Sequence, residues 1–436
     1  MRLLKNSRAH KSVGRSLLLF VAVLGFSTSL AISLASCREE KNPTVIIWTD
    51  RPELASYAEL FNTTHSDTKA MVIYKDSPIS SLPPMKGEYI PDLIVGPWLK
   101  SSTSRKYFKP VDYLFNEKKL IASDYYEQLL NYGVLNEKQY LVPLSFNLPA
   151  IVFTKANEGL IENEHIVTLE LLRDSAEKFN RRNRNDEYTS IGYAPSWDTD
   201  FMYMATRLNG ASYQEKGNGF SWNEKAIAKT VSFFRNWTSE INTSTAAEQN
   251  FQFKFLYMSK YRQLANGKCA FAYMTSDELF ALTNEQAAGL TFRWLVKDNS
   301  SVMVEDSIIT MGIYKYANNI KGAEIFMEWL SSEETQQALI QRTEKMHLDT
   351  VAFGIAGGFS ALKNVNANVF PTHYRVLLGN LPTEQNLDMP NILPYRWPEL
   401  KAKVIVPYLQ DSSNTENDLE EVDPIDIRIE ENNKVY

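Results

Sequence analysis

The sequence predicts an α/β protein built from two lobes. Short apolar runs of strand length alternate along the chain with segments whose apolar residues repeat at helical spacing. This alternation is typical of a mostly parallel sheet that is covered by helices on both faces. The chain has 436 residues, which is more than one ordinary hydrophobic core accommodates, so two domains or lobes are expected.

The amino-terminal region has the order of an export signal. Residues 1–15 carry five basic residues and no acidic one, and residues 16–35 are mostly leucine, valine, phenylalanine and alanine. The letters "LASC" that end in Cys37 resemble the lipobox of bacterial lipoproteins. The resemblance implies a signal peptide over residues 1–36, diacylation of Cys37 with groups such as palmitate, and a tether over residues 37–43. Simple secretion and a retained membrane helix remain alternatives, because the apolar run has nearly the length of a bilayer core.

The charge of the chain excludes one class of partner. Removal of residues 1–36 takes away five basic and no acidic residues, which leaves a formal net charge of −11 in place of −6. An acidic body without a basic cluster indicates that nucleic acid is not a partner. Cys269 is then the one thiol beside Cys37, so an intrachain disulfide is not expected and Cys269 is predicted to be a small buried apolar residue.

The first strand and helix of the predicted body place two candidates at a strand end. Residues 44–48 ("TVIIW") have the pattern of a buried strand, and residues 50–53 ("DRPE") have that of a helix start, with an acceptor at the cap and proline in the first turn. Leu54, Tyr57, Ala58 and Phe61 then fall on one apolar face of this helix. Trp48 and Asp50 therefore lie where ligands bind in open α/β sheets, beyond the carboxyl end of the strand. The alternatives are that Trp48 belongs to the core and that Asp50 only caps the helix.

A second and a third strand are expected at residues 70–74 and 91–99. The third is interrupted by Gly96-Pro97, a break that turns the chain at the same sheet edge and makes Trp98 a candidate ligand contact.

Two extended segments are expected to pass between the lobes. Residues 141–155 form an apolar run with two prolines, which is read either as two consecutive strands or as a crossover with Asn147 near a hinge. Residues 307–315 form the second crossing segment, and Asp306 stands at its entrance.

The segment after the first crossing offers three further candidates. Trp197 lies between a predicted strand end and a helix capped by Asp198 or Thr199, and Tyr273 ends the predicted strand at residues 269–274. From residue 411 onward nine acidic residues face two basic ones, so residues 410–436 are predicted to be a disordered acidic tail.

Taken in order, four stretches resemble the extracellular solute-binding proteins of ABC importers, in particular the sugar-type family 1. They are the lipobox with its spacer, "TVIIWTDRPELASYAELFN", "IPDLIVGPWL" followed by "YLVPLSFNLPAIVFTK", and "GKCAFAYM" followed by "MGIYK…KGAEIFMEWLSSEETQQAL". The resemblance implies a two-lobed periplasmic-binding-protein-like clamp of type II, with the lobes joined by hinge strands. The implied first lobe is 44–146 plus about 307–343, and the implied second lobe is 147–306 plus about 344–409.

The implied function is capture of a small solute, most simply a sugar or polyol, and delivery to the membrane subunits of an ABC permease. The implied protein is a monomer that is held by its lipid in the cell envelope and faces the periplasm or the exterior. A sugar site needs aromatic platforms together with carboxylates and amides that bond hydroxyls. The candidate ligand contacts are accordingly Trp48, Asp50, Trp98, Asn147, Trp197, Asp198, Tyr273 and Asp306.

An enzyme is not expected, because the hydrolase, zinc-protease and nucleotide-binding motifs are missing and the five histidines are isolated. No cofactor or metal is predicted. A glycosidase with two carboxylates stays open, since any two acids can meet in space. A surface lipoprotein with the same fold that acts as an adhesin or structural antigen is the alternative from another class.

Overall fold

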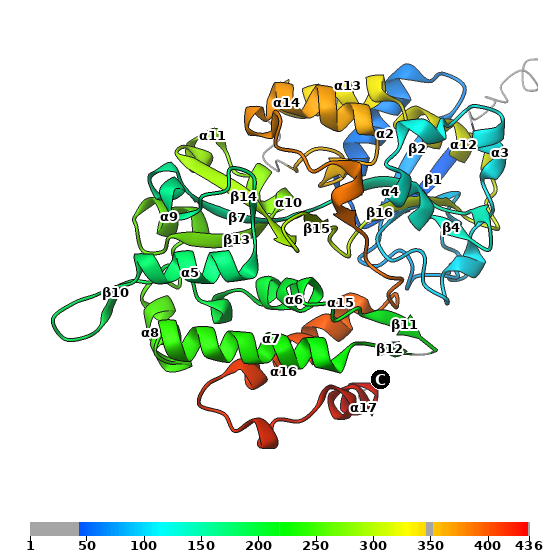
Figure 1. Ribbon diagram of the computed structural model, residues 1–436. Coiled ribbons are helices and arrows are strands. Elements are labelled where there is room, and N and C mark those ends of the chain that lie inside the picture. Colours follow the sequence, from blue (N-terminus) through cyan, green and yellow to red (C-terminus); the bar gives the residue numbers. More distant parts are fainter. Residues whose placement is uncertain (1–42, 218, 346–351, 435–436) are drawn as a thin grey trace, which may run out of the picture.

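The structure is a computed structural model that describes residues 43–217, 219–345 and 352–434 (Figure 1). The predicted signal peptide, Cys37 and residues 37–42 of the predicted tether lie outside the described residues. Among the described residues, no helix has the length and apolar character needed to cross a membrane. The described chain forms two sheets, each at the centre of one lobe.

The sheet of the first lobe is mixed rather than mostly parallel. Its order is β17-β6-β16-β3-β1-β2. The first three strands in the sequence run parallel, whereas β16 is antiparallel to β3 and β6, and β17 is antiparallel to β6. The bounds are β1 (Thr44–Thr49), β2 (Lys69–Tyr74), β3 (Leu93–Gly96), β6 (Val142–Phe146), β16 (Ile309–Ile313) and β17 (Phe359–Ser360).

Both faces of the first sheet are buried, which explains the continuous apolar runs of its strands. Along β1, Val45 and Ile47 pack into one core, whereas Ile46 and Trp48 belong to the core on the opposite face. The helices of this lobe are α2 (Glu53–Thr64), α3 (Asp112–Asn116), α4 (Glu127–Tyr132), α12 (Ile320–Leu330), α13 (Glu333–Lys345) and α14 (Phe370–His373).

The sheet of the second lobe is mostly antiparallel, in the order β13-β7-β14-β15-β18, with β8 paired to β14. Its strands are β7 (Pro149–Thr154), β8 (Ile166–Val167), β13 (Phe271–Thr275), β14 (Leu290–Lys297), β15 (Ser301–Met303) and β18 (Leu387–Asp388). The hairpins β4 (Val134–Leu135) with β5 (Lys138–Gln139), β9 (Arg181–Arg182) with β10 (Tyr188–Ser190), and β11 (Gln214–Lys216) with β12 (Gly219–Ser221) lie outside the two sheets.

Helices surround the second sheet (Figure 1). They are α5 (Leu169–Phe179), α6 (Thr199–Leu208), α7 (Glu224–Asn236), α8 (Thr245–Lys254), α9 (Lys260–Ala265), α10 (Ser276–Phe280), α11 (Asn284–Ala287), α15 (Trp397–Leu400), α16 (Val406–Ser413) and α17 (Ile425–Lys434). The predicted cap of α6 is confirmed, because the Asp198 side chain accepts hydrogen bonds from the backbone N–H groups of Asp200 and Phe201. Cys269 is buried and free, as expected.

Three segments pass between the lobes. The chain crosses from β6 to β7 through Asn147, and from β15 to β16 through residues 304–308. A third crossing leads from α14, beside the first sheet, to β18 in the second sheet. Both interpretations of residues 141–155 are therefore correct at once, since two consecutive strands form and the junction between them is an inter-lobe crossing.

Three observations differ from the sequence-based expectations. β17 pairs with β6 in the first sheet, so residues 359–360 belong with the first lobe and not with the second, where the range 344–409 was expected. Residues 425–434 form a helix instead of a disordered tail, and Arg235 donates hydrogen bonds to the carbonyls of Ser412, Asn414 and Asn417. Helix α2 has no side-chain cap, so Asp50 does not serve as its cap.

Candidate functional site at the junction of the two lobes

One edge of the first sheet gathers several predicted residues. Strands β1, β3 and β6 point the same way, while β16 and β17 run against them, so the ends of the first three and the starts of the other two share one edge. The residues just after or just before these ends include Asp50, Trp98, Asn147, Asp306 and Gly357. Register and topology together therefore place four of the eight candidates at one edge.

The other candidates come from the second lobe. β13 ends beside the start of β7, with Thr275 opposite Pro149, so Tyr273 lies near the first crossing. The Lys260 ammonium donates to Asp198 Oδ2 at 2.5 Å and to the Tyr273 carbonyl oxygen at 2.8 Å. This lysine joins the start of α6, which carries Trp197 and Asp198, to the end of β13.

The lobes touch close to this edge. The hydroxyl and the backbone N–H of Ser102 in the first lobe each donate to the Glu215 carboxylate in β11 of the second lobe, at 2.8 Å. Trp98 is partly exposed and packs against the core of the second lobe. The segment from Trp98 to Ser102 is therefore part of the boundary between the lobes.

Asp50 is held against the end of β3. Its carboxylate pairs with Arg51 at 3.2 Å, and its side chain keeps 15% of its surface exposed. A Cβ at Gly96 would stand 3.2 Å from Asp50 Oδ1, so glycine permits this close approach. Burial raises the pKa of Asp50, and the charge of Arg51 opposes that rise.

Trp98 has a backbone conformation that bulky residues seldom adopt. Its φ is +54°, in the left-handed region, which costs an L-residue other than glycine, asparagine or aspartate about 1–2 kcal/mol. The turn after Gly96-Pro97 imposes this conformation and directs the indole to the second lobe.

Trp197 is partly exposed and rests on a fixed support. Its ring is stacked on Phe251, with centroids 5.7 Å apart and planes inclined by 14°, and its indole N–H donates to the Glu248 carbonyl oxygen at 3.2 Å. The Glu248 side chain is fully buried and bonded to Ser196 and Asn242. These contacts fix the turn that carries Trp197.

Asn147 ties the two lobes together at the crossing. Its amide donates to the Gly357 carbonyl oxygen at 2.8 Å, and its side-chain oxygen accepts from the Ser276 hydroxyl at 2.6 Å. One partner lies beside the first sheet and the other at the start of α10.

The remaining four candidates are buried within the protein. Trp48 is fully buried in the core, with the Lys75 ammonium 4.4 Å from its ring. Tyr273 is 1% exposed and donates to Glu305 at 2.9 Å, and Asp198 both caps α6 and pairs with Lys260. Asp306 is 7% exposed.

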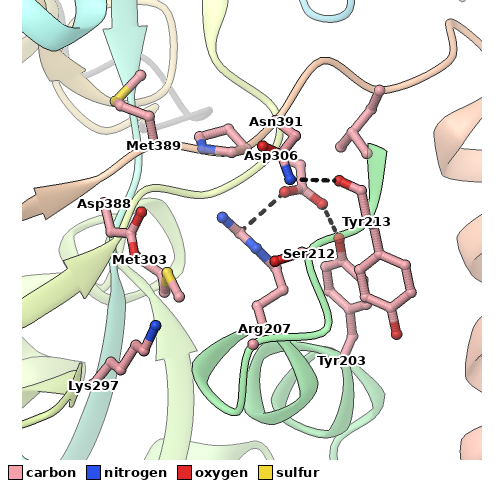
Figure 2. A pocket seen from close by; sticks show the side chains of 13 residues that line it. Tyr203, Arg207, Ser212, Tyr213, Lys297, Met303, Asp306, Asp388, Met389 and Asn391 are labelled. Atoms are coloured by element: carbon pink, nitrogen blue, oxygen red, sulfur yellow. Dashed lines mark hydrogen bonds and ion pairs between the residues drawn. The ribbon is translucent and has the colours of Figure 1, made fainter. Parts of the chain in front are cut away.

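Asp306 is the hub of a buried polar cluster (Figure 2). Its Oδ1 lies 3.0 Å from Arg207 Nη1, its Oδ2 accepts from the Trp397 indole at 3.0 Å, and the Tyr203 hydroxyl also donates to Oδ2. Burial alone would lower the pKa of Arg207, but the charge of Asp306 raises it above its usual value. The cluster adjoins a cavity of about 120 Å³ that is also lined by Ser212, Lys297, Asp388 and Asn391.

Sequence reasoning missed three residues of this region. Glu305 lies in the second crossing, where burial raises its pKa to about 7 against the opposing charges of Arg207 and Lys401. Lys100 and Tyr132 lie together on the first lobe, with the ammonium 4.9 Å from the ring centroid. Burial raises the pKa of Tyr132, and the charge of Asp306 adds to that rise. For Lys100, its place two residues after Trp98 was the available signal.

Within residues 43–217, 219–345 and 352–434, no group of three or more His, Cys, Asp and Glu side chains has the arrangement of a metal site.

No protein-family model matches the chain, and a search of curated proteins finds no match. Solved structures do match over most of its length. An ABC substrate-binding protein from Listeria monocytogenes in complex with cycloalternan has a TM-score of 0.62 and 14% identity, covering 91% of this chain and 99% of that chain. The fold is that of a two-lobed solute-binding protein.

Two further structures agree. The galacto-N-biose-/lacto-N-biose I-binding protein of the ABC transporter from Bifidobacterium longum has a TM-score of 0.59 and 12% identity, covering 91% and 98% of the two chains. An ABC transporter solute-binding protein from Thermotoga lettingae, bound with α-D-tagatose, has a TM-score of 0.58 and 16% identity, covering 90% and 99%. The predicted periplasmic-binding-protein-like fold with two lobes is confirmed.

Proposed function

We propose that this protein is the substrate-binding component of an ABC importer and binds a small carbohydrate between its two lobes. The observation that carries the proposal is a pair of partly exposed indoles: Trp98 of the first lobe, which packs against the core of the second, and Trp197 of the second lobe. An indole offers the flat apolar surface that the C–H face of a sugar ring packs against.

Polar groups beside these indoles supply the hydrogen bonds. Asp50 keeps part of its carboxylate exposed, and Asn147 lies at the crossing that both lobes share. The buried candidates, Trp48, Asp198, Tyr273 and Asp306, are left out of the proposed contacts, because their side chains are engaged inside the protein.

The fold supports capture by closure. Three crossing segments are the covalent connections between the described lobes, so a ligand that contacts both lobes stabilises the closed arrangement relative to the open one. The similar proteins were solved with cycloalternan, lacto-N-biose and α-D-tagatose, which supports a saccharide over other solutes. We further propose a monomer, without enzymatic activity, anchored in the cell envelope through Cys37 and partnered by permease subunits.

The test is ligand-dependent thermal stabilisation with a panel of mono- and oligosaccharides. Binding stabilises the folded state by about 2.7 kcal/mol when free ligand is at a hundredfold excess over Kd. Trp197→Ala is expected to reduce this stabilisation strongly, whereas Trp329→Ala is the matched control, since Trp329 is equally partly exposed but packs on Phe61 and Phe326 in the first lobe. A melting curve that no saccharide moves would refute the proposed function.

A further inference from the structure

Lys100 lies at the lobe boundary, between Trp98 and Ser102, and has no acidic partner among the described residues. Among the described residues, its ammonium makes no hydrogen bond and no ion pair. The Lys100 Nζ lies over the ring of Tyr132, 4.9 Å from the ring centroid. Lys100 is partly buried.

Four other cations of this region are paired with acidic residues. Arg207 lies 3.0 Å from Asp306, Lys260 lies 2.5 Å from Asp198, and Lys401 lies 2.8 Å from Asp200. On the first lobe, Arg51 pairs with Asp50 at 3.2 Å. Lys100, in contrast to these four, has no ion pair among the described residues and lies over the ring of Tyr132.

The position of Lys100 is set from both sides. Trp98 packs against the second lobe, and Ser102 is bonded to Glu215 of the second lobe, so the residue between them cannot move far from the boundary. Burial lowers the pKa of Lys100 to about 8, and no neighbouring carboxylate offsets that effect. A partly desolvated ammonium without a counter-charge is costly, and a ligand that supplies the counter-charge recovers that cost.

We propose that Lys100 binds the anionic group of an acidic saccharide, which is a uronate carboxylate or a sulfate or phosphate ester. The proposal rests on the proposed function and names its substrate class. A neutral sugar hydroxyl accepts a hydrogen bond from the ammonium but leaves its charge uncompensated, whereas an anion provides both the acceptor and the opposite charge. Tyr132 supports the ammonium from the protein side through its ring face.

The experiment is isothermal titration calorimetry with the mature, lipid-anchored protein in detergent and with matched ligand pairs. One arm compares oligogalacturonate with the neutral galactose oligomer of equal length, and a second compares hexose 6-phosphate and hexose 6-sulfate with the free hexose. In at least one arm the charged member is expected to bind about tenfold to a hundredfold more tightly, since a charge-assisted hydrogen bond is about twice as strong as a neutral one. The first arm tests recognition of a carboxylate, and the second tests recognition of a phosphate or sulfate ester.

Variants test whether the preference for charged ligands depends on the Lys100 side chain. Lys100→Met keeps most of the side chain's length without its charge and is expected to abolish the preference for the charged member, whereas Lys100→Arg is expected to retain most of that preference. Lys106→Met is the matched control, because Lys106 also lies over a tyrosine ring, at 5.1 Å from that of Tyr107, but is exposed. Thermal melting of the unliganded Lys100→Met protein verifies that it is folded.

The outcomes separate the two proposals. Equal affinity for charged and neutral members, or an unchanged preference in Lys100→Met, overturns the role of Lys100 and leaves carbohydrate binding in place. Binding of no member of any pair overturns the role of Lys100, and carbohydrate binding is overturned with it only if no saccharide of the wider panel moves the melting curve.

Discussion

Replacement of Asp306 by alanine is expected to destabilise the protein more than it weakens ligand binding. The carboxylate lies at the second crossing and is engaged by the Arg207 guanidinium, the Tyr203 hydroxyl and the Trp397 indole. Its side chain is 8% exposed, and that of Arg207 is 7% exposed. Asp306 therefore serves chiefly to hold α6, α15 and the crossing together.

The magnitude follows from what the substitution leaves behind. Asp306→Ala leaves the buried Arg207 charge without its partner. Loss of one partner of a buried ion pair costs about 3–5 kcal/mol of folding free energy. Asp306→Asn keeps an acceptor for Tyr203 or Trp397 and is expected to cost about 1–3 kcal/mol. The double variant Arg207→Met/Asp306→Ala removes both charges and is expected to be more stable than Asp306→Ala alone.

The assay is urea denaturation followed by tryptophan fluorescence, together with ligand titration of each folded variant. Asp298→Asn is the control, because Asp298 is exposed and has no ion pair among the described residues. A cost below about 1 kcal/mol for Asp306→Ala would refute the hub role. Loss of ligand affinity in a fully stable Asp306→Asn protein would instead restore Asp306 as a ligand contact, as the sequence alone suggested.

Three other predictions concern the pH response, the lobe contact and the anchor. The pKa of Glu305 is raised from 4.5 to about 7, so the folded state holds a proton that the unfolded state releases, and stability is expected to fall by up to about 3 kcal/mol as pH rises from 4.5 through 7. Glu305→Gln is expected to flatten this part of the curve of unfolding free energy against pH, and an unchanged curve would contradict the assignment. Glu215→Ala removes both bonds to Ser102 and is expected to weaken ligand binding severalfold while increasing the radius of gyration measured by small-angle scattering without ligand; unchanged values in both would show that the contact does not hold the lobes. Cys37→Ala is expected to release the protein from the membrane fraction with ligand affinity intact, and retention in that fraction would argue against the lipid anchor.

The local pattern of the sequence was sufficient for the strands and helices around the site. A short continuous apolar run predicted β1, and the i, i+3, i+4, i+7 spacing predicted the face of α2, whose Leu54, Tyr57, Ala58 and Phe61 are all buried. The cap by Asp198 was also predictable, because an N-cap depends on residues within one turn.

Long-range partners were not predictable in this way. Arg207 meets Asp306 across 99 positions and Ser102 meets Glu215 across 113, and nothing in the periodicity of either segment specifies the other. The same limit explains the tail, whose acidic composition indicated disorder. Arg235 of α7 bonds three of its carbonyls, and Ile425 is buried in the core of the second lobe, so contacts outside the segment determine its order.

The two lobes differ in which of their polar side chains are already bonded within the protein. On the second lobe, Asp198, Tyr273 and Asp306 each form an ion pair or a hydrogen bond with another side chain of the protein. These bonds fix α6, β13 and the second crossing relative to one another. A rigid, internally neutral surface can offer an indole such as Trp197 without contributing much charge selectivity. The first lobe retains the uncompensated Lys100 and the partly exposed Asp50 beside Trp98. If the proposed function holds, recognition of charge is expected from the first lobe and recognition of ring faces from both.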